Sequence, residues 1–125
     1  MLDHVGFGVT DYDRSKGFYE KVLAPLGIEL LMEPVAQAAG FGRDGKPFFW
    51  IETRGPAVNG GLHVAFVVDD RATVDAWHAN ALEAGAKDNG APGPRVIYHP
   101  NYYGAYVLDP DGNNIEAVCH KPQGT

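Results

Sequence analysis

Two histidines and two glutamates recur at related positions in the sequence, and their side chains are of the types that bind metal ions. His63 follows His4 by 59 positions, and Glu116 follows Glu52 by 64 positions. Two imidazole nitrogens and two carboxylate oxygens form a donor set that suits a divalent cation such as Zn, Ni, Co, Mn or Fe(II). Without a cation, two carboxylates facing one cavity would repel each other, and one would stay protonated. These four residues therefore predict a divalent metal site.

Each of the four residues also has an ordinary structural interpretation. A single histidine or glutamate in a sheet is usually a solvated or hydrogen-bonded residue. A sequence repeat can also persist after its ligand function has been lost. The recurrence of all four residues at repeated positions favours the metal site over these alternatives.

The two histidines begin a segment that occurs twice. His4–Asp11 aligns with His63–Asp70, and five positions of the alignment are identical. A stretch with glycine and proline, Arg54–Gly60, lies between the copies. A chain of 125 residues is long enough for one core but not for two large domains. We therefore predict a single domain over residues 1–125, built from two copies of one module at 1–54 and 61–119.

The elements that position these residues follow from hydrophobic periodicity. In each copy the period changes from two to about 3.6, which predicts a strand followed by a helix. Asp11 and Asp70 stand where helix N-caps are expected. Further strands are predicted at 28–32, 38–43, 48–53, 103–108 and 114–119. The prediction is an α+β fold of two βαβββ modules, with a curved mixed sheet around a metal or ligand cavity. The glycine- and proline-rich region 88–100 is predicted to be a loop over that cavity.

Strand alternation predicts which way the histidines point. His4 shares its face with Gly6 and Gly8, and His63 shares its face with Ala65. Residues this small leave the histidine face open, as a ligand chamber requires. Glu52 and Glu116 are predicted to occupy corresponding places in the last strand of each module.

The chain resembles the vicinal oxygen chelate superfamily, which includes glyoxalase I, extradiol dioxygenases and bleomycin-resistance proteins. The resemblance covers almost the whole chain and is carried by Leu2–Val5, Gly17–Glu20 and Leu108–Glu116, the last containing Asp-Pro-Asp-Gly. In such proteins a histidine and a glutamate from each module bind the metal. The resemblance thus implies the same four ligands, His4, Glu52, His63 and Glu116.

The resemblance also implies a type of reaction. Two adjacent substrate oxygens bind the ion, which stabilises an enediolate or another oxyanion. A glutamate in or beside the ligand shell then moves the proton, so Glu52 and Glu116 are the predicted catalytic residues. This implies a lyase or isomerase of the glyoxalase type that acts on a small oxygen-rich molecule. Gly8 and Pro56 depart from the arginine and asparagine typical of glyoxalase I, so glutathione is not a predicted substrate.

Two other functions stay open at this stage. Members with only two histidines and the final glutamate can hold Fe(II) and cleave catechols as dioxygenases. Members of the bleomycin-resistance type sequester a ligand without turnover. If Glu52 points away from the site, the Fe(II) dioxygenase gains support. The resemblance further implies a homodimer, and the region before the penultimate strand contributes four candidate pocket residues, Arg95, His99, Tyr102 and Tyr103.

Composition excludes several other classes of function. The net charge is −6 and no cluster of Lys and Arg is present, which argues against nucleic acid binding. The longest apolar run, Val64–Val68, is too short to cross a membrane. The sequence has no secretory signal pattern at its start, so a cytoplasmic location is expected. Cys119 is the only cysteine, which excludes an intrachain disulfide and a thiolate zinc cluster.

Overall fold

A computed structural model describes residues 1–124 as an α+β fold of two βαβββ modules. Module one contains a four-stranded mixed sheet in the order β1-β4-β3-β2, with β1 parallel to β4 and the other pairs antiparallel. Its elements are β1 (Val5–Gly8), α1 (Tyr12–Leu23), η1 (Ala24–Leu26), β2 (Glu29–Met32), β3 (Ala38–Arg43) and β4 (Lys46–Glu52).

Module two repeats this topology in the order β5-β8-β7-β6. Its elements are β5 (His63–Val67), α2 (Arg71–Glu83), β6 (Lys87–Pro94), β7 (Tyr103–Leu108) and β8 (Asn114–Cys119). The prediction of a loop over 88–100 is therefore wrong for its first half, which belongs to β6, the first of the three strands that follow the helix in this module. Strand β6 lies at the sheet edge and has two register shifts, which is where glycine and proline are tolerated in a sheet.

Both helices begin at the predicted aspartates. The Asp11 side chain accepts a hydrogen bond from the amide of Arg14, and the Asp70 side chain accepts one from the amide of Thr73. Asp70 also accepts from the Thr73 hydroxyl, and this hydrogen bond, together with the one from the amide, lowers the pKa of the Asp70 carboxyl. The caps fix where each chain segment leaves the first strand of its module.

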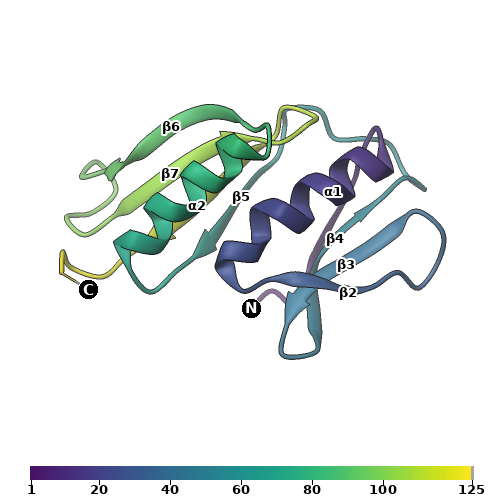
Figure 1. The fold of residues 1–125 in the computed structure, drawn as a ribbon, viewed down its shortest axis with the longest axis horizontal. Coiled ribbons are helices and arrows are strands. Elements are labelled where there is room, and N and C mark those ends of the chain that lie inside the picture. The colour runs from purple at the N-terminus through teal and green to yellow at the C-terminus, as the bar shows by residue number, and fades with distance from the viewer. Residues whose placement is uncertain (125) are drawn as a thin grey trace.

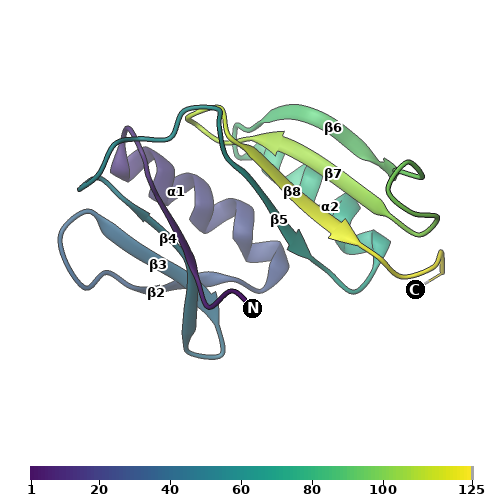
Figure 2. The same cartoon turned by 180° about the vertical axis from the view of Figure 1, so that it is seen from behind.

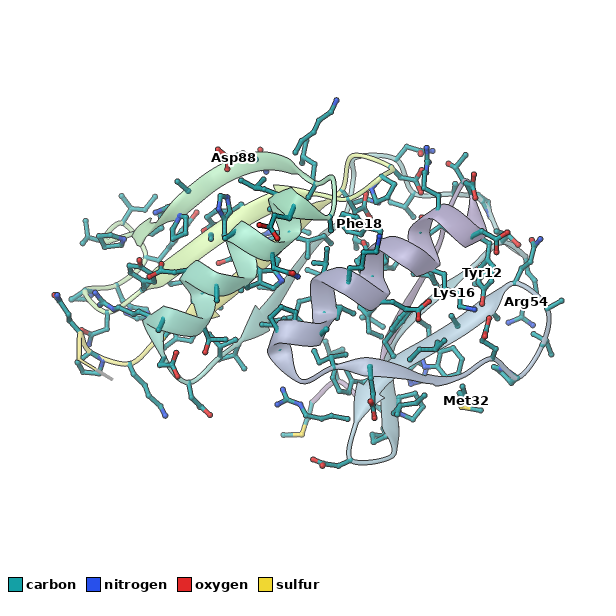
Figure 3. All side chains as sticks on the ribbon, viewed as in Figure 1. Tyr12, Lys16, Phe18, Met32, Arg54 and Asp88 are labelled. Carbon is teal, nitrogen blue, oxygen red and sulfur yellow. The ribbon has the colours of Figure 1, made fainter. Side chains whose placement is uncertain are left out.

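Helix α1 is also tied to the segment between β2 and β3. Glu33 accepts hydrogen bonds from the Tyr12 hydroxyl at 2.5 Å and from Lys16 Nζ at 2.9 Å. Tyr12 and Lys16 lie close together on the side of α1 that faces this segment (Figure 3). Hydrogen bonding to Tyr12 and Lys16 lowers the pKa of Glu33, while burial and the Glu33 carboxylate raise the pKa of Tyr12.

The two helices cover one side of the two sheets, and the strands are exposed on the other side (Figures 1 and 2). The buried apolar side chains form a single cluster that extends through both modules, with Phe49 and Phe66 in contact at a ring separation of 5.4 Å. Strands β1 and β5 lie at the inner edges of their separate sheets (Figure 2). In the described part of the chain neither helix is long and apolar enough to cross a membrane.

The Asp-Pro-Asp-Gly turn between β7 and β8 fastens the two modules together. Buried Asp109 accepts a hydrogen bond from the Tyr19 hydroxyl of α1 at 2.5 Å and from the backbone amides of Asp111 and Asn113. Buried Asn113 donates to the carbonyl of Val58, within the linker between the modules. The Asp-Pro-Asp-Gly segment therefore has a structural role here.

Candidate functional site

In module two, Glu116 forms a buried polar centre on the open face of the sheet. Its side chain is 1% exposed, and its Oε1 lies 2.8 Å from Nε2 of His63, which is 53% exposed. The Tyr102 hydroxyl donates a hydrogen bond to Oε2. Alternation along β8 places Ile115 and Ala117 in the core and Glu116 on the opposite face. The predicted pair His63 and Glu116 is thus brought together.

A glycine makes room for this centre. A methyl group at Gly104 would lie 3.1 Å from Glu116 Oε2 and 3.3 Å from Tyr102 Cε1. Burial and the neighbouring Glu116 carboxylate raise the pKa of Tyr102 well above its ordinary value. Burial likewise raises the pKa of Tyr106, which lies directly opposite Glu116 in the sheet. Both phenols therefore stay protonated at neutral pH, and Tyr102 acts as a fixed donor to the carboxylate.

Three of the four predicted pocket residues lie beside this centre. The His99 ring is 5.5 Å from the Tyr102 ring, and its Nε2 lies 2.8 Å from Nδ1 of His120. The Arg95 guanidinium stacks over the Tyr106 ring at 5.3 Å. The prediction fails for Tyr103, which lies on the helix side of the sheet and donates to Asp75 of α2 at 2.6 Å. Alternation along β7 explains this difference.

In module one, His4 and Glu52 line a separate cavity of about 630 Å³ on the open face, together with Gly6, Trp50 and Arg54. His4 is 59% exposed and its Nδ1 lies 2.8 Å from Asp3. The Glu52 Oε2 atom accepts hydrogen bonds from the backbone amides of Arg54 and Gly55. Arg54 lies at the outer end of this module, away from module two (Figure 3). The Glu52 carboxylate is therefore held by the turn that follows its own strand.

The strand register corrects the predicted equivalence of the two glutamates. Glu116 pairs with Ala65, which is two residues after His63. The matching partner of Gly6, two residues after His4, is Trp50, whereas Glu52 pairs with Gly8. The residue that corresponds to Glu52 in module two is Val118. Trp50 therefore occupies the place of Glu116, and sequence offset alone misaligned the two modules.

The four predicted ligands do not converge within one chain. In residues 1–124 no group of three or more His, Cys, Asp or Glu side chains is arranged to hold a metal ion. One nitrogen and one carboxylate donor meet at His63 and Glu116, and His4 stands apart in the other module. This pair has the right donor chemistry for a divalent ion but is incomplete on its own. The expected cavity with all four ligands is not formed by a single copy.

The sequence matches one protein family over most of its length. The family model described as Glyoxalase/Bleomycin resistance protein/Dioxygenase superfamily matches residues 1–117. The chain belongs to this superfamily. No functionally curated protein matches it. The superfamily includes enzymes as well as proteins that are not enzymes, so membership does not by itself assign a reaction.

Solved structures of superfamily members share the fold. A glyoxalase/bleomycin resistance protein from Albidiferax ferrireducens T118 is 32% identical, with a TM-score of 0.78 and coverage of 94% of this chain and 97% of its own. A lactoylglutathione lyase from Agrobacterium tumefaciens is 22% identical, with a TM-score of 0.70 and coverage of 100% and 96%. The fosfomycin resistance protein FosX from Mesorhizobium loti is 21% identical, with a TM-score of 0.69 and coverage of 97% and 92%. The last two show similarity of fold alone.

Sequence reasoning missed Trp50 as a site residue. The available signal was its spacing, since Trp50 lies two residues before Glu52 and therefore shares its face of the strand. Its neighbours across the sheet, Gly6 and Gly40, could only be identified once the register was known.

Proposed function

We propose that this protein is a divalent-metal-dependent lyase or isomerase that binds a small molecule through two adjacent oxygens. The observation that carries the proposal is the buried Glu116 carboxylate, held between His63 and Tyr102 on an open sheet face. A buried carboxylate is costly unless its charge is compensated. A divalent cation beside Glu116 and His63 would supply that compensation.

The metal donors in this proposal are His63, Glu116 and His4. When bound, the ion would act as a Lewis acid that stabilises negative charge on substrate oxygen. Tyr102 fixes the Glu116 carboxylate through its hydroxyl, because the raised pKa of Tyr102 keeps this donor protonated. Such partners of a ligand typically change metal affinity by about 10- to 100-fold when removed.

Glu52 is proposed as the group that moves a proton, and not as a metal ligand. It lines the same cavity as His4, and its side chain is 24% exposed. Two backbone amides hold its Oε2, so the carboxylate has a fixed position relative to that cavity. A positioned carboxylate of this kind can accept a proton from a carbon next to a substrate carbonyl and return it elsewhere.

A second copy of the chain is proposed to complete the site. The open face of module one in one copy would lie against the open face of module two in the other, which brings His4 to His63 and Glu116. In the described part of the chain no strand pairs with the inner edge of β5, and the inner edge of β1 is paired only at Gly8, which bridges to Ala57 of the linker. Leu2 and Val67 near these edges are 86% and 63% exposed. Edges and apolar side chains of this kind favour association.

Metal retention tests the donor set. The purified protein, dialysed against Zn, Ni, Mn or Fe(II) in turn, is expected to retain about one ion per chain, and the Glu116→Gln variant is expected to retain far less. The variant H99A/H120A is the matched control, because it removes two neighbouring imidazoles, 2.8 Å apart, that could bind metal adventitiously. Loss of metal in this control, with full retention in Glu116→Gln, would contradict the assignment.

Subunit complementation tests the shared site. His4→Ala and His63→Ala chains are each expected to retain little metal alone. When the two are unfolded together and refolded, mixed dimers would contain one site with both mutations and one intact site. Recovery of about one ion per mixed dimer supports the shared arrangement. If mixing recovers none while the wild-type protein refolds with its metal, the donors come from a single chain.

An Fe(II) dioxygenase is the second candidate, and the register favours it. With Trp50 in the place of a glutamate, the proposed donors are two histidines and one carboxylate, a set typical of non-haem Fe(II) oxygenases. Oxygen consumption with catechol by the Fe(II)-loaded protein separates the two reactions. Consumption that depends on Glu116 would support the dioxygenase, and its absence in a protein that retains Fe(II) would leave the lyase or isomerase.

A further inference from the structure

Trp50 lies flat on the open face of module one because both of its neighbours in the sheet lack a side chain. It is on β4, between Gly6 of β1 and Gly40 of β3. A methyl group at Gly40 would lie only 2.8 Å from Cη2 and Cζ2 of the indole, and one at Gly6 would lie 3.3 Å from Trp50 Cβ. The six-membered ring of the indole therefore rests on the backbone of Gly40.

The outer side of this indole is available to a ligand. Trp50 is only partly buried and lines the cavity of about 630 Å³ that also contains His4, Glu52 and Arg54. The volume is within the usual range of small-molecule sites, which are about 300–1,000 Å³. The cavity thus has a flat aromatic floor with polar groups around it, an arrangement that orients a planar molecule.

We propose that Trp50 is the specificity-determining residue of this cavity and receives a flat, conjugated ring of a small molecule by stacking. The inference deepens the proposed function, because His4 would then meet the polar substituents of the same ligand. A ring that lies on the indole buries apolar area and also gains the offset-stacked contact between aromatic systems. A puckered saturated ring of similar size gains the first contribution but loses much of the second.

The chain provides its own spectroscopic reporter. It has two tryptophans, and Trp77 is fully buried, so Trp50 is the one that a ligand can contact. Stacking on Trp50 should quench or shift its fluorescence. In the Trp50→Phe variant the remaining signal comes from Trp77 and should not respond.

The experiment compares benzoate with cyclohexanecarboxylate, which share charge and approximate size but differ in planarity. Binding is measured by tryptophan fluorescence and by calorimetry, first in protein stripped of metal with EDTA and then in metal-loaded protein. We expect benzoate to bind more tightly by about five- to tenfold, and the preference to fall to about one in Trp50→Leu. Trp50→Phe, which keeps a smaller aromatic ring, should retain part of the preference for benzoate.

The outcomes separate this inference from the proposed function. A preference for benzoate that requires Trp50 supports the stacking site, even if the protein retains no metal and the proposed function fails. If the protein retains metal through Glu116 but binds the two acids with equal affinity, or binds neither, the stacking site is overturned and the proposed function is not. A preference for benzoate that survives in Trp50→Leu also overturns it, because the ring must then bind elsewhere.

Discussion

The contact between Trp50 and Gly40 predicts a strong energetic coupling between the two positions. In the wild-type background, Gly40→Ala places a methyl group 2.8 Å from the indole. Because the cavity lies above, the indole can lift away from the sheet, so the cost is lost packing and not a broken backbone. Overpacking of this kind destabilises proteins by about 1–3 kcal/mol, against a gain of about 0.5–1 kcal/mol for replacing glycine in a strand.

The effect of Gly40→Ala on the free energy of unfolding should change sign once the indole is removed. In a Trp50→Ala background the same Gly40→Ala change has no ring to meet, so it should stabilise the protein by about 0.5–1 kcal/mol. The coupling free energy between the two positions is therefore expected to be about 1–3 kcal/mol. Urea unfolding of the four proteins measures it, and a red shift of Trp50 emission in Gly40→Ala would report the lifted ring.

Gly17 of α1 offers a matched control for this double-mutant cycle of Gly40 and Trp50. A methyl group there meets nothing within 4 Å. Gly17→Ala should therefore stabilise the helix by about 0.5–1 kcal/mol in either Trp50 background. If the Gly40 and Trp50 effects instead add to within about 0.5 kcal/mol, the indole does not rest on Gly40 and the basis of the stacking site is removed.

Four further changes test other parts of the structure. Gly8→Ala should destabilise the protein by about 3 kcal/mol in urea unfolding, because its methyl group would lie 2.1 Å from the Pro56 carbonyl oxygen, and unchanged stability would contradict this close approach. Tyr19→Phe should cost about 1.5–3 kcal/mol, because it removes a hydrogen bond to the buried Asp109 carboxylate, and calorimetric melting would measure the loss. Tyr102→Phe should weaken metal retention by about 10-fold or more without changing the circular dichroism spectrum, and unchanged retention would separate Tyr102 from the site. The pKa of the Asp70 carboxyl is lowered in the folded protein, so its contribution to the free energy of unfolding is present above the unfolded pKa of about 3.9 and is lost as the pH falls through the folded pKa. Asp70→Asn keeps a helix cap that does not titrate, so the stability of this variant should fall less steeply below about pH 4 than that of the wild type. Parallel profiles of stability against pH for the two proteins would refute this assignment.

Alternation and capping were predictable from the sequence because they depend on near neighbours. The facing of Val5, Phe7 and His4 follows from a period of two, and the caps at Asp11 and Asp70 follow from the residue types at the start of each apolar stripe. The α+β fold of two βαβββ modules is confirmed on this basis, together with the superfamily.

Strand register was not predictable, because it depends on loop lengths and bulges. The recurrence of glutamate at positions 52 and 116 suggested equivalent places in the two sheets. The register instead pairs Glu52 with the residue four positions after His4, and Glu116 with the residue two positions after His63. His78 shows the same limit for burial. It is buried on α2 and its Nε2 lies 2.9 Å from Oδ1 of Asp88, which belongs to β6, a strand in the region that composition predicted to be a loop.

The two modules have the same topology but opposite chemistry at one sheet position. Glu116 lies between Ala65 and Tyr106 and has hydroxyl and imidazole partners, whereas Trp50 lies between two glycines that leave room for an indole. An indole at position 116 would overlap the Tyr102 hydroxyl, which already contacts the shorter carboxylate, and a carboxylate at position 50 would find no side-chain donor on Gly6 or Gly40. One face is therefore suited to polar donors and the other to a flat apolar ring. A single ligand can contact both faces only if they lie opposite each other, as they would in the proposed dimer. If a change at Trp50 removes the preference for a planar ring without affecting metal retention, and Glu116→Gln removes metal retention without affecting that preference, the two faces form two separate sites and not one chamber.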